Sequence, residues 1–161
     1  MILDGDRIAH YLYRPYTYVW KAIHKRFGDE ILNKDDKFNT AALRKIVFSN
    51  HDALDDLNKI VHPAIIHYLK DEIYHRRQSK NIVVVAALWE ELKLPEICDK
   101  ILCISADNKI SFQRIQKRDG VPKEEYESYT SRQATCPIAA FSIENNGDFK
   151  EFYEKLNALT L

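Results

Sequence analysis

The sequence predicts an α/β fold with a mainly parallel sheet, and three observations lead to this class. Short apolar runs alternate along the chain with segments whose apolar residues recur at helical spacing. The run at residues 82–85 (IVVV) has no polar alternation, which is typical of a strand covered on both faces in a parallel sheet. Only 4 glycines and 5 prolines occur in 161 residues, which favours a chain rich in helix.

Four short segments are expected to form the strands of this sheet. The first is ILD at residues 2–4, and the β-branched run at 82–85 is the second. ILCIS at residues 101–105 and IAAFSIE at residues 138–144 complete the set. Because helical patterns separate these segments, we expect them to pair in parallel.

The first expected helix runs from Thr17 to Phe27. Its apolar residues fall at every fourth position, and Gly28 follows as the residue that closes a helix. A second helix is expected around Leu43 and Val47.

A third helix is expected from Asp52, with a break at His62-Pro63 and a continuation to Ile73. Proline disfavours helical backbone in the residue before it, so we expect His62 at a kink with its imidazole facing a cleft. Two more helices are expected at residues 107–118 and 149–156.

Composition excludes several classes of function. The 24 basic and 24 acidic residues cancel, so no overall field attracts nucleic acid or an anionic membrane. The three cysteines match no metal or redox spacing, which favours reduced thiols and excludes a zinc site. The sequence shows no leader peptide and no apolar run long enough to span a bilayer. We therefore expect a soluble, cytoplasmic protein with no resident metal; the oligomeric state cannot be read from the sequence.

Asp4 and Asp6 are the first candidates for catalysis. They follow the first strand, and ligands of open α/β sheets bind beyond the carboxyl ends of the strands. Gly5 between them allows the backbone to approach a ligand closely. A carboxylate there can deprotonate an attacking hydroxyl group. The alternative is that Asp6 caps a helix beginning at Arg7.

The segment QRIQKRDG supplies a second candidate site. Arg114, Lys117 and Arg118 lie three and four residues apart, so they share one side of the expected helix. Such a cluster can bind phosphate groups. The alternative is a solvated basic face that interacts with the negative end of the helix dipole.

His62 and Asn58 form a third candidate. A histidine at this position can bond the ribose or phosphate of a nucleotide, and the alternative is that it caps a helix end. The tyrosines and tryptophan between residues 11 and 20 can stack on a base, although such aromatic side chains more often pack in a core.

Seven stretches, in this order, resemble those of one family over residues 2–156. The family is the dephospho-coenzyme A kinases, P-loop enzymes that phosphorylate the ribose 3′-hydroxyl of dephospho-CoA in the last step of coenzyme A biosynthesis. The resemblance implies a three-layer, P-loop-kinase-like parallel sheet with a helical substrate lobe and a short lid. It also implies dephospho-CoA as substrate and ATP with Mg²⁺ as cofactors. The stretches are ILDGDRIAH, FGDEIL, LRKIVFSN, LNKIVHPAI, VVVAALWEE, RIQKRDG and ENNGDFKEF.

The resemblance also implies roles for the candidate residues. Asp6 is similar to the family's general base, with Asp4 beside it. His62, with Asn58, belongs to the substrate lobe, and Arg114 and Arg118 are similar to cations beside the lid. Asn146 and Gly147 are expected near the adenine of the nucleotide or at a strand-to-helix turn.

The same resemblance implies a division of the chain. A single kinase-like domain covers residues 1–161, with its core formed by residues 1–15, 79–118 and 138–161. The substrate lobe is expected at about residues 16–78 and the lid at about residues 119–137.

The family's phosphate loop has no counterpart in these 161 residues. In the family, ILDGD forms the second strand, and a first, central strand and the loop G-x-x-x-x-G-K-S/T precede it. None of the four glycines here lies five residues after another or precedes a lysine. That loop supplies the amides that hold ATP, and its strand would cover the apolar faces of its neighbours. We therefore expect a chain truncated at the N-terminus that is inactive as it stands.

Three hypotheses remain open at this point. The first is a dephospho-CoA kinase whose N-terminal segment is absent from the sequence given. The second is a degenerate, non-catalytic kinase-like module that binds a nucleotide or a protein. The third, an enzyme similar to nucleoside monophosphate kinases, is disfavoured because the lobe stretches fit it less well.

Overall fold

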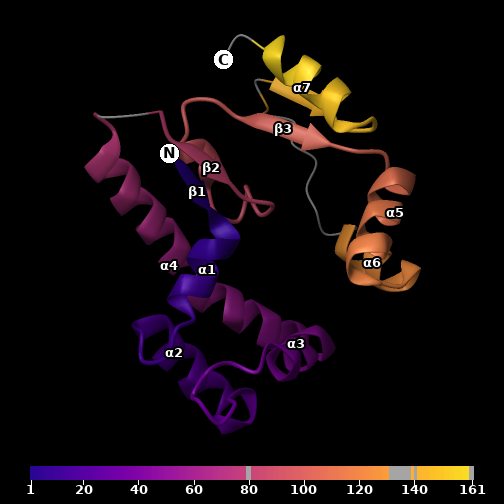
Figure 1. The fold of residues 1–161 in the computed structure, drawn as a ribbon. Coiled ribbons are helices and arrows are strands. Elements are labelled where there is room, and N and C mark those ends of the chain that lie inside the picture. Colours follow the sequence, from indigo (N-terminus) through magenta and orange to yellow (C-terminus); the bar gives the residue numbers. More distant parts are fainter. Residues whose placement is uncertain (79–80, 131–138, 140, 160–161) are drawn as a thin grey trace. The chain divides into compact units, whose positions relative to one another are not determined.

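The computed structural model describes residues 1–78, 81–130, 139 and 141–159 (Figure 1). The chain divides into two units, residues 1–94 and residues 95–161. In the described parts, each unit contains one pair of parallel strands. The parallel pairing predicted from the sequence is therefore confirmed, although the expected single sheet is seen as two separate pairs.

The first unit is a two-stranded sheet with a group of helices. Strand β1 (Ile2–Asp4) pairs in parallel with β2 (Val83–Val85), and Asp4 lies opposite Val85. Helix α1 (Gly5–Leu12) follows β1 directly and packs against α4 (His51–Arg76), the long helix of the unit. The remaining helices, α2 (Tyr18–Phe27) and α3 (Thr40–Ser49), also pack against α4.

Helix α2 matches its prediction closely. It ends at Phe27, and Gly28 follows with a φ of 77°, a backbone conformation that glycine adopts without strain. At the other end, the hydroxyl oxygen of Thr17 accepts a hydrogen bond from the N–H of Trp20. The apolar stripe expected from the spacing is buried, with Val19 and Ile23 fully covered.

The predicted break at His62-Pro63 is wrong, because α4 continues through Pro63 for 26 residues. Proline removes one backbone hydrogen bond from the helix. Buried side chains on both sides of the proline, Val61 before it and Ala64 and Ile65 after it, pack into the core and hold the two halves in line.

The prediction that the strand at 82–85 is covered on both faces is also wrong. Leu3 is buried on one face of the β1–β2 pair. On the other face Ile2, Val83 and Val85 are 71%, 53% and 51% exposed. Within residues 1–94, no described residue covers this face, so a sequence pattern typical of a fully buried strand occurs at the surface of the first unit.

The second unit has a smaller core. Strand β3 (Leu102–Ser105) pairs in parallel with β4 (Phe141–Glu144), and α7 (Phe149–Asn157) packs against β4. Helix α5 (Asn108–Asp119) is followed by Gly120, which has a φ of 70°. Helix α6 (Lys123–Thr130) lies in the segment expected to form the lid, whose residues 131–137 fall outside the described residues. Among the helices described, none is both long and apolar enough to cross a membrane.

Candidate active site

Asp4 caps helix α1. Its Oδ1 accepts hydrogen bonds from the N–H groups of Asp6 at 3.0 Å and Arg7 at 3.2 Å. The alternative that Asp6 caps a helix beginning at Arg7 is therefore wrong, because the helix begins at Gly5 and its cap is Asp4. Asp4 suits this position because its backbone is still extended at the end of β1, which leaves the side chain beside the first free amides of the helix.

Asp6 lies in the first turn of α1 and is exposed. Its carboxylate has no hydrogen bond or ion pair with any residue that the structure describes, so a ligand can reach it. Of the two aspartates, Asp4 has a structural partner and Asp6 is available for chemistry.

Gly5 brings the two strand ends together. A β-carbon at this position would lie 3.3 Å from the carbonyl oxygen of Val85 and 3.4 Å from the β-carbon of Ala86. We expected the glycine to admit a ligand; its close neighbour is instead the chain at the end of β2. Asp6 therefore lies beside the carboxyl ends of both strands, where ligands of parallel sheets bind.

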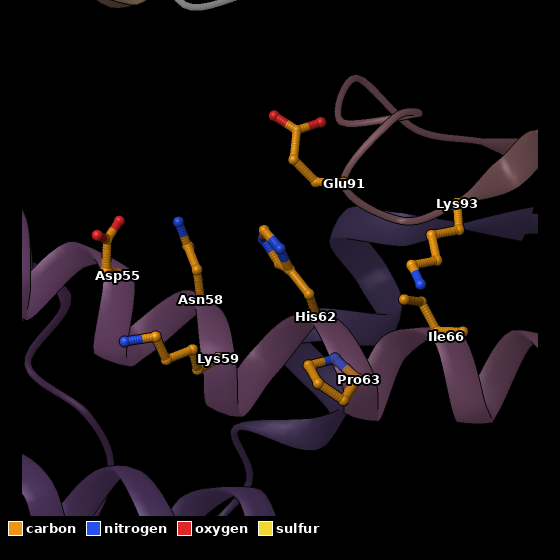
Figure 2. Close-up of a pocket in the computed structure, with 8 residues that line it drawn as sticks. All are labelled: Asp55, Asn58, Lys59, His62, Pro63, Ile66, Glu91 and Lys93. Atoms are coloured by element: carbon orange, nitrogen blue, oxygen red, sulfur yellow. The ribbon is translucent and has the colours of Figure 1, made fainter.

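His62 and Asn58 line a shallow cavity of about 340 Å³ on helix α4 that is largely open to solvent (Figure 2). The two residues are one helical turn apart, so their side chains share a face. The segment after β2 forms the opposite wall with Glu91 and Lys93. The volume is at the lower end of the range for ligand pockets and is large enough for part of a nucleotide-sized molecule. The remaining lining residues are Asp55, Lys59, Pro63 and Ile66.

The imidazole of His62 is half-buried. Burial lowers the pKa of His62 below its ordinary value, and the nearby Glu91 carboxylate opposes this effect. A neutral imidazole at pH 7 presents one donor and one acceptor to a ligand. His62 can therefore bond a hydroxyl group or a base without carrying charge.

Sequence reasoning missed Glu91 and Lys93. Neither residue belongs to a recognisable motif, and the nearest signal was the stretch VVVAALWEE. Their place in the cavity follows from the path of the chain after β2, which the sequence pattern did not reveal. The aromatic residues between positions 11 and 20 were expected either to pack in the core or to stack on a base. In the structure Tyr16 and Tyr18 are exposed, whereas Trp20 lies in the core.

The basic residues of α5 do not gather around one point in the structure. The two guanidinium Nη atoms of Arg114 donate to the carbonyl oxygens of Asn145 at 2.6 Å and Gly147 at 2.9 Å. Arg118 instead forms an ion pair with the adjacent Asp119. Both guanidinium groups therefore have partners within the chain.

Asn146 and Gly147 lie in the turn between β4 and α7. The side-chain oxygen of Asn146 accepts a hydrogen bond from the N–H of Asp107, the residue before α5. Together with the Arg114 bonds, this contact ties the turn to helix α5. The predicted strand-to-helix turn is therefore where the sequence analysis placed it.

The described residues do not fit the triphosphate of ATP. Phosphate binds where the free amides at a helix N-terminus point at it. At each described strand-to-helix turn the residue before the helix is an aspartate: Asp4 before α1, Asp107 before α5 and Asp148 before α7. A carboxylate at this position repels phosphate, and Asp4 and Asp148 also occupy amides of their helices. In the described parts of the chain, no group of three or more His, Cys, Asp or Glu side chains could hold a metal ion.

Comparisons of this chain with known proteins find relatives in one family. The sequence model of the dephospho-CoA kinase family matches residues 1–151. A dephospho-CoA kinase of Fusobacterium nucleatum is 31% identical over 159 residues, which cover 96% of this chain and 81% of the relative.

Two solved structures share the fold. A Thermus thermophilus protein superposes with a TM-score of 0.75 at 22% identity. The superposition covers 98% of this chain and 81% of the Thermus chain. A dephospho-CoA kinase from Campylobacter jejuni superposes with a TM-score of 0.63 at 23% identity. The superposition covers 96% of this chain and 80% of the Campylobacter chain. The family match, together with the P-loop-kinase-like fold, shows that this chain belongs to the dephospho-CoA kinase family.

Proposed function

We propose that these residues form the acceptor side of a dephospho-CoA kinase of the cytoplasm. The cavity on α4 binds part of dephospho-CoA, and Asp6 accepts the proton of the ribose 3′-hydroxyl. The observation that supports this role is the free carboxylate of Asp6 at the ends of β1 and β2. His62 and Asn58 supply neutral hydrogen-bonding groups to the same ligand.

We further propose that the 161-residue polypeptide binds its acceptor but does not transfer phosphate from ATP. Its sequence lacks the phosphate loop, and its described strand-to-helix turns carry aspartates where a phosphate would need free amides. The expected result for the purified polypeptide is saturable binding of dephospho-CoA in calorimetry and no ATP-dependent 3′-phosphorylation. Turnover by this polypeptide would contradict the second part of the proposal.

The role of Asp6 can be tested through binding alone. A carboxylate bonded to the 3′-hydroxyl should make dephospho-CoA bind about tenfold more tightly than its 3′-deoxy analogue. In Asp6→Asn this preference should shrink, because the charged acceptor is gone. Asp4→Asn is the matched control: asparagine caps helices as well as aspartate, so the preference should stay as in the wild type. An undiminished preference in Asp6→Asn would contradict the assignment of Asp6.

A second candidate function is a non-catalytic module that binds a protein. The exposed apolar face of Ile2, Val83 and Val85 favours it, because contiguous apolar surface often marks an interaction site. Failure of the polypeptide to bind dephospho-CoA would favour this candidate over the first.

A further inference from the structure

Lys93 has an unusual backbone conformation for a lysine. Its φ is 51°, in the left-handed region that glycine and asparagine adopt most readily. The N–H of Leu94 donates a hydrogen bond to the carbonyl oxygen of Trp89 at 3.0 Å. The N–H of Lys93 donates one to the carbonyl oxygen of Glu90 at 2.9 Å. This is the Schellman pattern that ends a helical turn, and Lys93 occupies the position where glycine is most common.

The turn that carries Lys93 is fixed in place. Leu92 and Leu94, on either side of it, are both buried in the core of the first unit. Lys93 itself is exposed and lines the cavity beside His62. Figure 2 shows its side chain extending toward Ile66, while Glu91 lies above His62 in this view with its carboxylate directed away from helix α4. The packing therefore holds a strained residue with its ammonium group at the cavity wall.

Two lysines line the cavity, and Lys93 is the one without an anionic partner among the described residues. The other one, Lys59, lies 3.4 Å from a carboxylate oxygen of Asp56. No hydrogen bond or ion pair joins Lys93 to any residue within the described ranges. The helix cap accounts for the left-handed backbone, but no ion pair among the described residues accounts for a lysine at a position that favours glycine. Strained residues of this kind concentrate at ligand sites.

We propose that Lys93 binds the diphosphate group of the acceptor in this cavity. This inference rests on the proposed function, since dephospho-CoA carries its negative charge on the diphosphate and its ribose hydroxyls are neutral. Glu91 and Asp55 would repel phosphate from the rest of the cavity, whereas they can accept hydrogen bonds from hydroxyl or amino groups. Lys93 therefore sets both the preference for a diphosphate and the direction in which the ligand lies.

The variant Lys93→Gly separates a binding role from a structural one. Glycine adopts the left-handed backbone without strain, so the midpoint of thermal unfolding should be the same as in the wild type or higher. Removal of the ammonium should weaken dephospho-CoA binding about tenfold in calorimetry. Lys93→Arg should retain most of the affinity, because the charge is kept. A solely structural role for Lys93 predicts the opposite pattern, with stability lost and affinity kept.

Lys34→Gly is the matched control, since it removes the same charge from an exposed loop of the same unit. Its affinity for dephospho-CoA should equal that of the wild type. Added salt should weaken binding more in the wild type than in Lys93→Gly. Equal affinity in Lys93→Gly and the wild type would overturn the assignment of Lys93 and leave the proposed function intact.

Inorganic pyrophosphate serves as a second probe. If the wild type binds pyrophosphate but not dephospho-CoA, and Lys93→Gly loses that binding, the anion site is supported and the proposed function is overturned. If the wild type binds neither molecule, both are overturned.

Discussion

The two units of the chain differ in how they are held together. In the described parts, residues 95–161 contribute only Tyr126 and Ile143 to the buried apolar core, and its other members lie in residues 1–94. Helices α5 and α7 bury no residue, whereas α4 alone buries five. The first unit therefore has a core of its own, and the second depends more on hydrogen bonds at its strand pair and turns.

This difference matters for function because the proposed acceptor site lies on the better-packed unit. Asp6 is on α1, the cavity is built on α4, and both helices bury apolar side chains. Rigid packing holds binding groups in position at low entropic cost. We therefore expect acceptor binding to depend on the first unit and to tolerate loosening of the second.

The largest expected effect is on the core of the first unit. Leu69→Ala removes a fully buried side chain of α4 and should lower the free energy of unfolding by about 2–5 kcal/mol. Ile143→Ala in the second unit should cost less, because fewer buried side chains surround it. Urea titration can compare the two: the fluorescence of Trp20 and Trp89 follows the first unit and measures Leu69→Ala, whereas circular dichroism also follows the second unit and measures Ile143→Ala.

The wild type provides the matching control. Tryptophan fluorescence should follow residues 1–94 alone, while circular dichroism follows the helices of both units. The dichroism transition should begin at lower urea than the fluorescence transition. Coincident transitions, or equal costs for Leu69→Ala and Ile143→Ala, would contradict the unequal stability of the two units.

Local rules predicted most of the fold. The apolar stripe of Val19, Ile23 and Phe27 located α2, and Gly28 located its end, because caps and periodicity depend on neighbours in sequence. The parallel pairing of the strands also followed from the alternation of strands and helices.

Predictions that depend on distant packing failed. Pro63 was expected to break α4, but buried neighbours outweigh one lost hydrogen bond. Val83 and Val85 were expected to be covered, but coverage depends on what lies over the strand. Lys93 was missed for a similar reason, since a left-handed lysine leaves no mark in the sequence that distinguishes it from any surface lysine.

A smaller effect is expected from the hydrogen bonds of the second unit. Arg114→Ala removes two bonds to the carbonyl groups of Asn145 and Gly147 and should lower the free energy of unfolding by about 1 kcal/mol. Arg118→Ala, on the same helix, should have less effect, because its ion pair with Asp119 is exposed. Circular dichroism in urea measures both variants. Equal losses would contradict a special role for the Arg114 bonds.

The smallest effect concerns pH and acts on the first unit alone, which contains all six histidines. Burial lowers the pKa of His62, so the unfolded chain takes up a proton at higher pH than the folded chain. The contribution of His62 to stability is therefore complete above its unfolded pKa of 6.5 and declines as pH falls toward the folded value.

Glu91→Gln sharpens this test. Loss of the carboxylate removes the interaction that raises the pKa of His62, so that pKa should fall further and the decline in stability at acidic pH should deepen. NMR titration of the His62 ring gives the pKa, and fluorescence in urea at pH 5 and pH 7 gives the stability. The variants Asp55→Asn and Lys93→Gln measure how far the other cavity charges contribute. An unchanged His62 pKa in Glu91→Gln would show that burial alone sets it and that Glu91 does not face the imidazole in solution.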